Sequence, residues 1–176
     1  MSTRLIYSLA TTDALAASFS DQTLLQAMCD FESALARAEA HVGIVPAWAA
    51  EVITRAATAE GLDIGAIVVS TRANGTASIA LVKALEARVE AVDADAARYV
   101  HLGATSQDVF DTALILCVRT AWSTIDADHQ RLCLTLGALS DAHAASVVLG
   151  RTLMQPAPPV TFGLKVAGWL GDFLRR

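Results

Sequence analysis

The chain is organised around the stretch Tyr99-Val-His-Leu-Gly-Ala-Thr-Ser-Gln-Asp-Val-Phe-Asp-Thr112, where a polar turn gives way to a long apolar periodicity. Thr105 and Asp108 stand in the T-x-x-D order typical of a helix start, with the threonine hydroxyl as the N-cap and an acid three residues on. Gly103 allows a tight turn just before this cap. The stretch therefore predicts a helix that begins at about residue 106.

The predicted helix start is also a candidate binding site for an anion. Backbone N–H groups at a helix start lack partners and carry a partial positive charge, so they can bind a carboxylate or a phosphate. Thr105, Ser106 and Gln107 add hydroxyl and amide donors there, and His101 lies just upstream. A capping box alone is ordinary helix chemistry. The gathering of these polar residues favours a site.

The composition allows one domain, or a domain and a half, with a large core. The chain has 176 residues, of which 54% are hydrophobic and 18% are charged. Ala and Leu dominate and aromatic residues make up only 6%, which favours helix over sheet. The net charge of −5 argues against nucleic-acid binding, which ordinarily uses a basic stripe.

Cysteine usage and hydropathy indicate a cytoplasmic protein that is not embedded in a membrane. Cys29, Cys117 and Cys133 form no C-x-x-C motif, so neither a zinc site nor a disulfide framework is indicated, and we expect three small buried residues. Polar residues interrupt the N-terminal segment 1–19, which excludes an export signal. The run 113–118 is among the longer apolar runs and is far too short to span a membrane.

Before the central stretch, the apolar periodicity predicts helices separated by turns. We expect an irregular lead-in at 1–19, helices at 21–41, 47–59, 63–69 and 77–92, a polar break at 70–76 and a connection at 93–98. The Asn-Gly pair in the break marks a turn between helices, so a hairpin is not expected there.

The helix at 21–41 has the strongest pattern of these elements. Ser20 precedes it as a cap, and Gly43 and Pro46 follow in the usual stop order. Its predicted apolar stripe is Leu24, Met28, Phe31, Leu35 and Ala38. Glu32 and Glu39 are expected to flank this stripe.

After the central stretch, the pattern predicts one helix from 106 to about 148. Its apolar stripe is Leu114, Val118, Ala121, Ile125, Leu132, Leu136 and Leu139. Roughly forty residues give a rod of about 60 Å, which indicates a long bundle or coiled-coil-like packing. Three prolines between 156 and 159 predict a loop at 151–163, and another helix begins at Val160 or Thr161. That helix has no clear end, so we expect a longer protein.

Two segments resemble signature sequences of the fumarase/aspartase superfamily. The first is His101-Leu-Gly-Ala-Thr-Ser-Gln-Asp108, and the second is Gly150-Arg-Thr-Leu-Met-Gln155. The segment 19–40, the turn that carries Asn74, and the Leu-Met pair of the second signature are most similar to the muconate cycloisomerase branch. The resemblance covers essentially the whole chain but only the first part of the family's length.

The resemblance implies an all-α fold, with an N-terminal helical domain at 1–104 and the first part of a long-helix bundle at 105–176. It also implies lactonization of a carboxylated muconate or a close anionic analogue, with no metal or organic cofactor. In this superfamily, signature segments from three subunits meet at one site of a tetramer. We therefore expect a homotetramer that binds a small polycarboxylate.

The resemblance assigns roles to residues of both signatures. His101 is the candidate proton carrier. The candidate substrate-binding residues are Asn74, Thr105, Ser106, Gln107, Arg151, Thr152 and Gln155. Arg151 could equally bridge two helix ends, and Asn74 could be a plain turn residue.

Two alternatives stay open. The first is another lyase of the superfamily, such as one resembling adenylosuccinate lyase; those lyases keep a histidine where this chain has Leu153. The second is a non-catalytic helical module for oligomerisation, because the third signature of the family, a flexible loop with a serine and a lysine, is absent from these residues.

Overall fold

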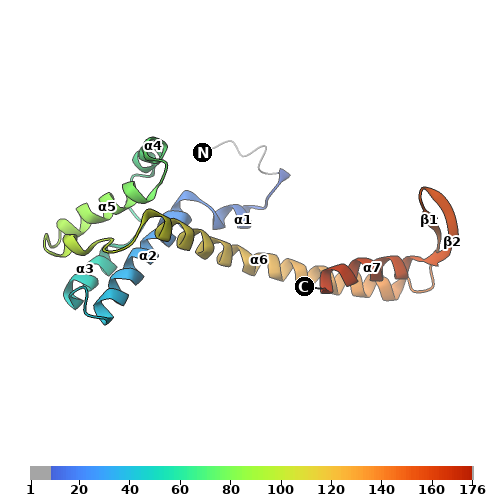
Figure 1. The fold of residues 1–176 in the computed structure, drawn as a ribbon. Coiled ribbons are helices and arrows are strands. Elements are labelled where there is room, and N and C mark those ends of the chain that lie inside the picture. Colours follow the sequence, from blue (N-terminus) through green and yellow to red (C-terminus); the bar gives the residue numbers. More distant parts are fainter. Residues whose placement is uncertain (1–8, 176) are drawn as a thin grey trace. The chain divides into compact units, whose positions relative to one another are not determined.

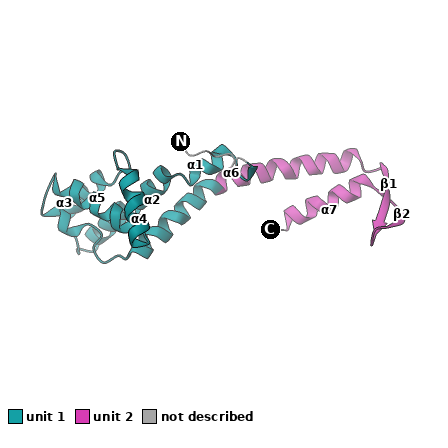
Figure 2. Cartoon of the chain, turned by 90° about the horizontal axis from the view of Figure 1, so that it is seen from above, with its two compact units in different colours: residues 1–121 teal, residues 122–176 magenta. Residues whose placement is uncertain are grey.

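The computed structural model describes residues 9–175, and its regular structure is helical apart from one small sheet (Figure 1). The elements are α1 (Asp13–Ser18), α2 (Asp21–His41), α3 (Ala47–Ala56), α4 (Ile64–Asn74), α5 (Ser78–Glu90), the 3-10 helix η2 (Ala96–Tyr99), α6 (Ser106–Ala142), β1 (Val147–Thr152), β2 (Gln155–Thr161) and α7 (Phe162–Leu174). They form two compact units, residues 1–121 and 122–176 (Figure 2). The predicted all-helical class is confirmed; the sheet was not predicted.

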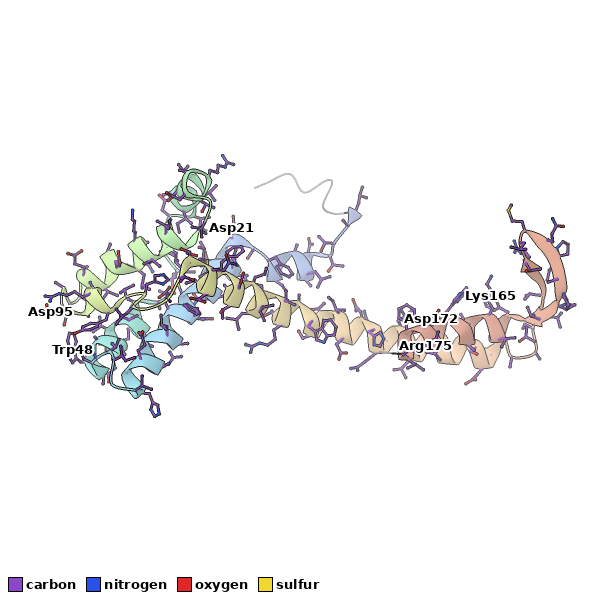
Figure 3. All side chains as sticks on the ribbon, in the orientation of Figure 1. Asp21, Trp48, Asp95, Lys165, Asp172 and Arg175 are labelled. Atoms are coloured by element: carbon purple, nitrogen blue, oxygen red, sulfur yellow. The ribbon has the colours of Figure 1, made fainter. Side chains whose placement is uncertain are left out.

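The first unit has a closed apolar core. Helix α2 packs against α3 and α5, η2 packs against α3 and α5, and α4 packs against α5. The side chains of Met28, Ile53 and Leu81 are at most 1% exposed. Burying each such side chain contributes about 1.5–3 kcal/mol relative to leaving it in water. Trp48 of α3 closes one edge by an edge-to-face contact with Tyr99 of η2, at a centroid distance of 6.4 Å (Figure 3).

Helix α2 has the predicted bounds but not the predicted buried face. Ser20 caps it by accepting a hydrogen bond from the Thr23 N–H at 3.2 Å. Its buried residues are Leu25, Ala27, Met28, Cys29, Glu32, Ser33, Ala36 and Glu39. The predicted stripe was therefore displaced around the helix. Two glutamates that were expected to flank it lie inside, because α3, α5 and the turn before α6 cover that side.

Helix α4 corrects the predicted break at 70–76. Asp63 caps it as predicted, accepting from the Ala66 N–H at 2.9 Å, but the helix continues to Asn74. The polar side chains of its last turns bond back to their own backbone, as in the 2.7 Å bond from Thr71 Oγ1 to the Ile67 carbonyl. Gly75, with φ 73°, ends the helix in the left-handed conformation. The Asn-Gly pair is thus a helix end, and no hairpin forms there.

Smaller differences affect the other elements of the first unit. Helix α3 ends at Ala56 rather than at 59, because the Arg88 guanidinium donates to the carbonyls of Thr58 and Glu60 at 2.6 Å and holds that segment as a loop. Helix α5 is slightly shorter than predicted, and the connection after it contains η2. The lead-in contains α1; its residues 1–8 lie outside the described range.

The second unit corrects the prediction for the segment after the long helix. Helix α6 ends at Ala142, and the predicted loop is an antiparallel hairpin of β1 and β2. The three prolines lie on β2, and Pro158 and Pro159 fall at the irregularity between the pairs Gly150–Ala157 and Val148–Val160, where a missing N–H donor is tolerated. Helix α7 begins where predicted, capped by Thr161, which accepts from the Leu164 N–H at 3.1 Å.

The long helix α6 buries only part of the predicted stripe, namely Ala121 and Leu136. Its residues Val109, Ala113, Cys117 and Ala121 are at most 3% exposed. The predicted residues Leu114, Val118, Ile125 and Leu132 are 38–41% exposed. Small residues lie against the core because they let the helix approach closely, and the larger apolar residues are left uncovered in the chain.

The thiols and the hydropathy agree with part of the predictions. Cys29 and Cys117 are buried, whereas Cys133 is only partly buried, which the sequence did not predict. Within residues 9–175, no helix combines the length and the apolar character that crossing a membrane requires.

Candidate functional site

The start of α6 carries the predicted capping box. The Thr105 N–H and the Thr105 hydroxyl both donate to Asp108 Oδ2 at 2.9 Å, and the Asp108 N–H lies 3.4 Å from Thr105 Oγ1. These hydrogen bonds, first of all the one from the Thr105 backbone, hold the pKa of Asp108 below its usual value. Because Asp108 occupies the donors of Thr105, Ser106 is the hydroxyl residue of this motif that remains available to a ligand.

His101 is held from behind by a buried carboxyl group. Its Nδ1 lies 2.7 Å from Glu32 Oε1, and the Glu32 side chain is fully buried. The backbone of His101 is left-handed, with φ 57°, a conformation that residues other than glycine rarely adopt. Gly103, also left-handed, completes the predicted turn. The first signature is thus a fixed turn and not a mobile loop end.

A second buried carboxyl group, Glu39, lies against the same turn. A Cβ atom placed on Gly103 would lie 3.6 Å from Glu39 Oε1, and Glu39 is 8% exposed. Burial raises the pKa of both Glu32 and Glu39; for Glu32 the nearby His101 acts in the opposite direction. Within residues 9–175, the Oε2 atoms of both glutamates have no hydrogen-bond partner.

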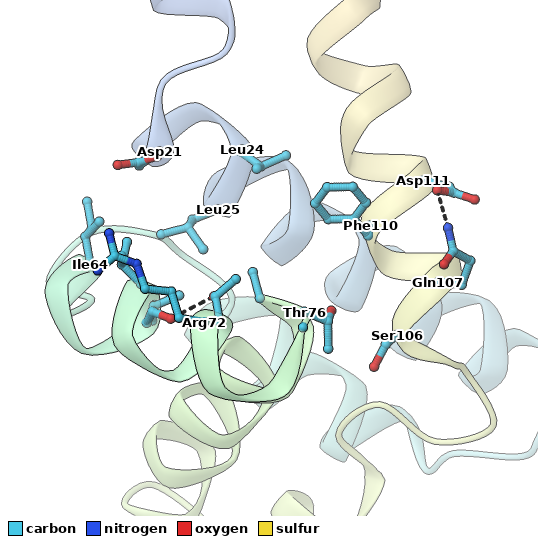
Figure 4. A pocket seen from close by; sticks show the side chains of 15 residues that line it. Asp21, Leu24, Leu25, Ile64, Arg72, Thr76, Ser106, Gln107, Phe110 and Asp111 are labelled. Carbon is cyan, nitrogen blue, oxygen red and sulfur yellow. Dashed lines mark hydrogen bonds between the residues drawn. The ribbon is translucent and has the colours of Figure 1, made fainter.

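A cleft of about 650 Å³ opens beside the start of α6 (Figure 4). Ser106, Gln107 and Phe110 line it from α6, and Arg72 and Thr76 line it from α4 and the turn that follows. Apolar side chains of α2 and α4 form its floor. Gln107 donates to Asp111 Oδ1 at 2.6 Å. The cleft thus combines apolar side chains with hydroxyl groups, one guanidinium group and the carboxyl groups of Asp21 and Asp111.

The predicted residues of the first unit do not all reach this cleft. Ser106 and Gln107 line it, whereas His101 and Thr105 are not among its lining residues. Asn74 is exposed, and its amide donates to the carbonyl of Ser70 at 2.9 Å and lies 3.1 Å from the Ser70 hydroxyl. Asn74 therefore bonds to its own helix in this structure.

The second signature forms the tip of the hairpin in the second unit. Thr152 pairs with Gln155, and Leu153 and Met154 make the turn with φ values of 45° and 64°. Arg151, Thr152 and Gln155 are all exposed. Gly150 is required here, because a Cβ atom would lie 2.3 Å from the Pro158 carbonyl oxygen. The predicted binding residues at 151–155 thus share one exposed end of a hairpin.

Sequence reasoning missed Glu32 and Arg72. Glu32 stands seven residues from both Leu25 and Glu39, a spacing that puts all three on one helix face, and this was the available signal. Arg72 was assigned to the polar break and could not be placed without knowing that α4 continues. Within residues 9–175, no group of three His, Cys, Asp or Glu side chains could hold a metal ion.

A helical domain that leads through a capped polar turn into a long helix is the architecture that the resemblance to the fumarase/aspartase type of lyase predicts. The family described as "Lyase" matches residues 8–176. The chain belongs to this lyase family, as the resemblance of the two signatures predicted.

Several characterised relatives are similar along most of the chain. A 3-carboxy-cis,cis-muconate cycloisomerase of Pseudomonas aeruginosa is 49% identical over 89% of this chain and 34% of its own length. A nitrosuccinate lyase of Streptomyces davaonensis is 47% identical over 88% of this chain and 32% of its own length. The crystal structure of the 3-carboxy-cis,cis-muconate lactonizing enzyme from Pseudomonas putida superposes with a TM-score of 0.92 at 45% identity, covering 98% of this chain and 39% of that one. The chain thus spans between about a third and two fifths of the length of these relatives.

Proposed function

We propose that the full-length protein is a cofactor-independent cycloisomerase that converts 3-carboxy-cis,cis-muconate, or a close anionic analogue, into a muconolactone. The observation that carries this proposal is the 49% identity with the cycloisomerase of Pseudomonas aeruginosa over 89% of the chain. Leu153 supports it further, because a leucine has no proton to give where the related lyases keep a histidine.

The proposed reaction is an intramolecular addition. One carboxylate of the substrate attacks the conjugated double bond, a C–O bond forms, and the adjacent carbon receives a proton after an enolate-like intermediate. The enzyme must hold the carboxylates, stabilise the developing charge and move one proton. Ser106 and the backbone N–H groups at the start of α6 suit the first task, and Arg72 offers a cation in the same cleft. His101 is the proposed proton carrier.

We propose in addition that the full-length protein is a homotetramer and that the second signature completes the site. Large apolar residues along α6 support this, since Phe110, Ile115, Trp122 and Leu134 are 36–76% exposed in the single chain. Exposed apolar surface of this kind marks a contact with further protein. Arg151, Thr152 and Gln155 are then donors from the exposed hairpin to a bound polycarboxylate.

The biological setting of the proposal is cytoplasmic breakdown of aromatic compounds through protocatechuate. The free thiols of Cys29, Cys117 and Cys133 suit a reducing compartment. The proposed substrate has three carboxylates and a conjugated diene, as expected for an intermediate of that breakdown.

A lactonization assay of the purified full-length protein tests the function. Loss of the ultraviolet absorbance of 3-carboxymuconate on addition of enzyme is the expected result. Leu153→His should leave adenylosuccinate uncleaved, because one histidine does not rebuild a purine-nucleotide pocket. Efficient adenylosuccinate cleavage by that variant would contradict the assignment, and inactivity of the wild type on all substrates would favour a non-catalytic oligomerisation module.

A second candidate is elimination from a nitro-substituted succinate. The 47% identity with a nitrosuccinate lyase over 88% of the chain is almost as high as that with the cycloisomerase. Both substrates are small polyanions, so the cleft described above does not separate them. A comparison of kcat/KM for nitrosuccinate and 3-carboxymuconate with one enzyme preparation separates the two functions. The true substrate should have a kcat/KM higher by orders of magnitude.

A further inference from the structure

A buried carboxylate that the proposed reaction does not use lies directly behind His101. Glu32 Oε1 and His101 Nδ1 are 2.7 Å apart, although the two residues are 69 positions apart in the sequence. The Glu32 side chain is fully buried, whereas the His101 side chain is 19% exposed. One edge of the imidazole is therefore fixed inside the first unit, and the rest of the ring reaches its surface.

The other ring nitrogen, Nε2, has a different environment. Among residues 9–175, Nε2 has no hydrogen-bond partner. Unlike Glu32 Oε2 and Glu39 Oε2, it is not a buried atom without a partner. Nε2 is thus the nitrogen that a ligand or solvent can reach. The left-handed backbone of His101 persists only where surrounding contacts fix it, and the short bond to Glu32 is such a contact.

The charged groups around Glu32 leave the imidazole as its partner of opposite charge in the described structure. Glu39 of the same helix and Glu86 of α5 both act on Glu32 as like charges, and His101 acts as the opposite one. Asp108 at the start of α6 also interacts with His101. Burying Glu32 costs free energy unless it is paired, so the fold maintains this contact against the cost of desolvation.

We propose that Glu32 is a positioning residue for His101. Its carboxylate accepts a hydrogen bond from the Nδ1–H group of the imidazole and so directs Nε2 to the proton transfer. This inference rests on the proposed function. The protonated ring holds its Nε2 proton while Glu32 balances the positive charge. When that proton passes to the substrate carbon, the N–H bond breaks and a C–H bond forms. The neutral ring then keeps its remaining proton on Nδ1, shared with Glu32.

The kinetic test compares two buried glutamates of one helix in the full-length protein. Glu32→Gln should lower kcat by about tenfold or more while KM changes by less than about threefold, because proton transfer is impaired and binding is not. Glu39→Gln is the matched control: it removes another buried carboxyl group of the same helix, which forms no hydrogen bond with His101 among the described residues. Its kcat should stay within about twofold of the wild type.

A double-mutant cycle separates positioning from a merely structural role. If Glu32 acts through His101, adding Glu32→Gln to His101→Gln should lower kcat by less than about twofold further. A double variant whose kcat falls by the product of the two single-variant losses would overturn the proposal. Equal losses of kcat in Glu32→Gln and Glu39→Gln would overturn it as well, since the effect would then follow burial and not contact with His101.

A spectroscopic test does not depend on the substrate. In ¹⁵N-histidine-labelled full-length protein, the signal missing from His101→Gln identifies His101, and its neutral ring should carry the proton on Nδ1. Glu32→Gln should raise the population protonated on Nε2, because an amide oxygen accepts a weaker bond than a carboxylate does. A ring protonated on Nε2 in the wild type overturns the inference. A wild type that pairs as described but leaves 3-carboxymuconate unchanged overturns the proposed function alone.

Discussion

The two units differ in how much of their apolar surface they cover by themselves. The first unit buries side chains from α2, α3, α5 and the start of α6 in one continuous core. In the second unit, Leu136 and Val166 are the buried apolar residues among those described, while Leu134, Leu153 and Met154 are 76–98% exposed. The first unit has a closed core of its own, whereas the second is a set of helices and a hairpin that leaves many of its large apolar side chains exposed.

This difference extends to the two signatures. The first signature is fixed within its unit by a capping box and by the hydrogen bond between His101 and the buried Glu32, so the first unit holds this geometry by itself. The second signature lies at an exposed hairpin tip, where the side-chain positions are fixed by little more than the conformation of the backbone. One half of the proposed site is therefore preorganised, and the other half is the one that the proposed tetramer would complete.

The largest expected effect distinguishes apolar residues buried in the core of the first unit from those exposed along α6. Leu81→Ala, in the core of the first unit, should lower the free energy of unfolding by about 2–5 kcal/mol in a denaturant titration. Trp122→Ala removes a side chain that is 55% exposed in the chain, and should leave the first unit folded while shifting the assembly to smaller species in light scattering. A tetramer unaffected by Trp122→Ala would show that this part of α6 is not an assembly surface.

A second prediction compares the starts of two helices. Replacing Thr105 and Ser106 together by alanine should lower kcat/KM by about tenfold or more, because a bound carboxylate loses the Ser106 hydroxyl donor and the start of α6 loses the Thr105 cap. The tetramer should stay intact. Thr161→Ala removes the matching cap of α7 in the second unit, at a similar cost of about 0.5–2 kcal/mol in stability. Equal kinetic losses in the two variants would mean that only helix stability is at stake.

A third prediction compares two glycines. Gly75→Ala should cost about 1–2 kcal/mol because the residue is left-handed, even though its Cβ position is open. Gly168→Ala, in α7 of the second unit, also has open space but ordinary helical conformation, so it should stabilise by about 0.5–1 kcal/mol. Thermal melts would show the opposite signs, and a loss of stability at Gly168 would indicate that a partner covers that face.

The smallest expected effect concerns pH. The folded-state pKa of Glu39 is raised by burial above 4.5, so ionisation opposes folding, and this penalty grows as pH rises from 4.5 through the raised pKa. Glu39→Gln should therefore raise Tm at pH 7, with a gain that disappears below about pH 4.5. Asp141→Asn, which changes an exposed carboxyl group of the second unit, is the matched control. A pH-independent gain in Glu39→Gln would contradict the burial of a charge.

Local signals in the sequence predicted more than long-range ones did. The predicted caps Ser20, Asp63 and Thr105 were correct, since a capping side chain acts on N–H groups of the next turn. The inward turn of Glu32 depends on a histidine far along the chain, and its burial could not be foreseen from a stripe of apolar residues.

The remaining errors have the same physical origin. The hairpin of β1 and β2 forms through pairing across strands, which a run of prolines conceals. The predicted stripe of α6 was correct only in part, because apolar residues occur around much of the helix and the core covers mainly the small ones. The family resemblance was confirmed by comparison; the roles of His101, Asn74 and the hairpin residues stay predictions.

The three thiols should react with alkylating reagents at different rates. Burial raises the pKa of the Cys29 thiol to about 11 and also raises that of Cys117, so alkylating reagents meet neither an accessible nor an ionised sulfur while the first unit is closed. Cys133, in the second unit, is only partly covered. Timed alkylation followed by peptide mass spectrometry should modify Cys133 early and the other two only as fast as the first unit opens. Each sulfur thus reports the lifetime of the structure that surrounds it.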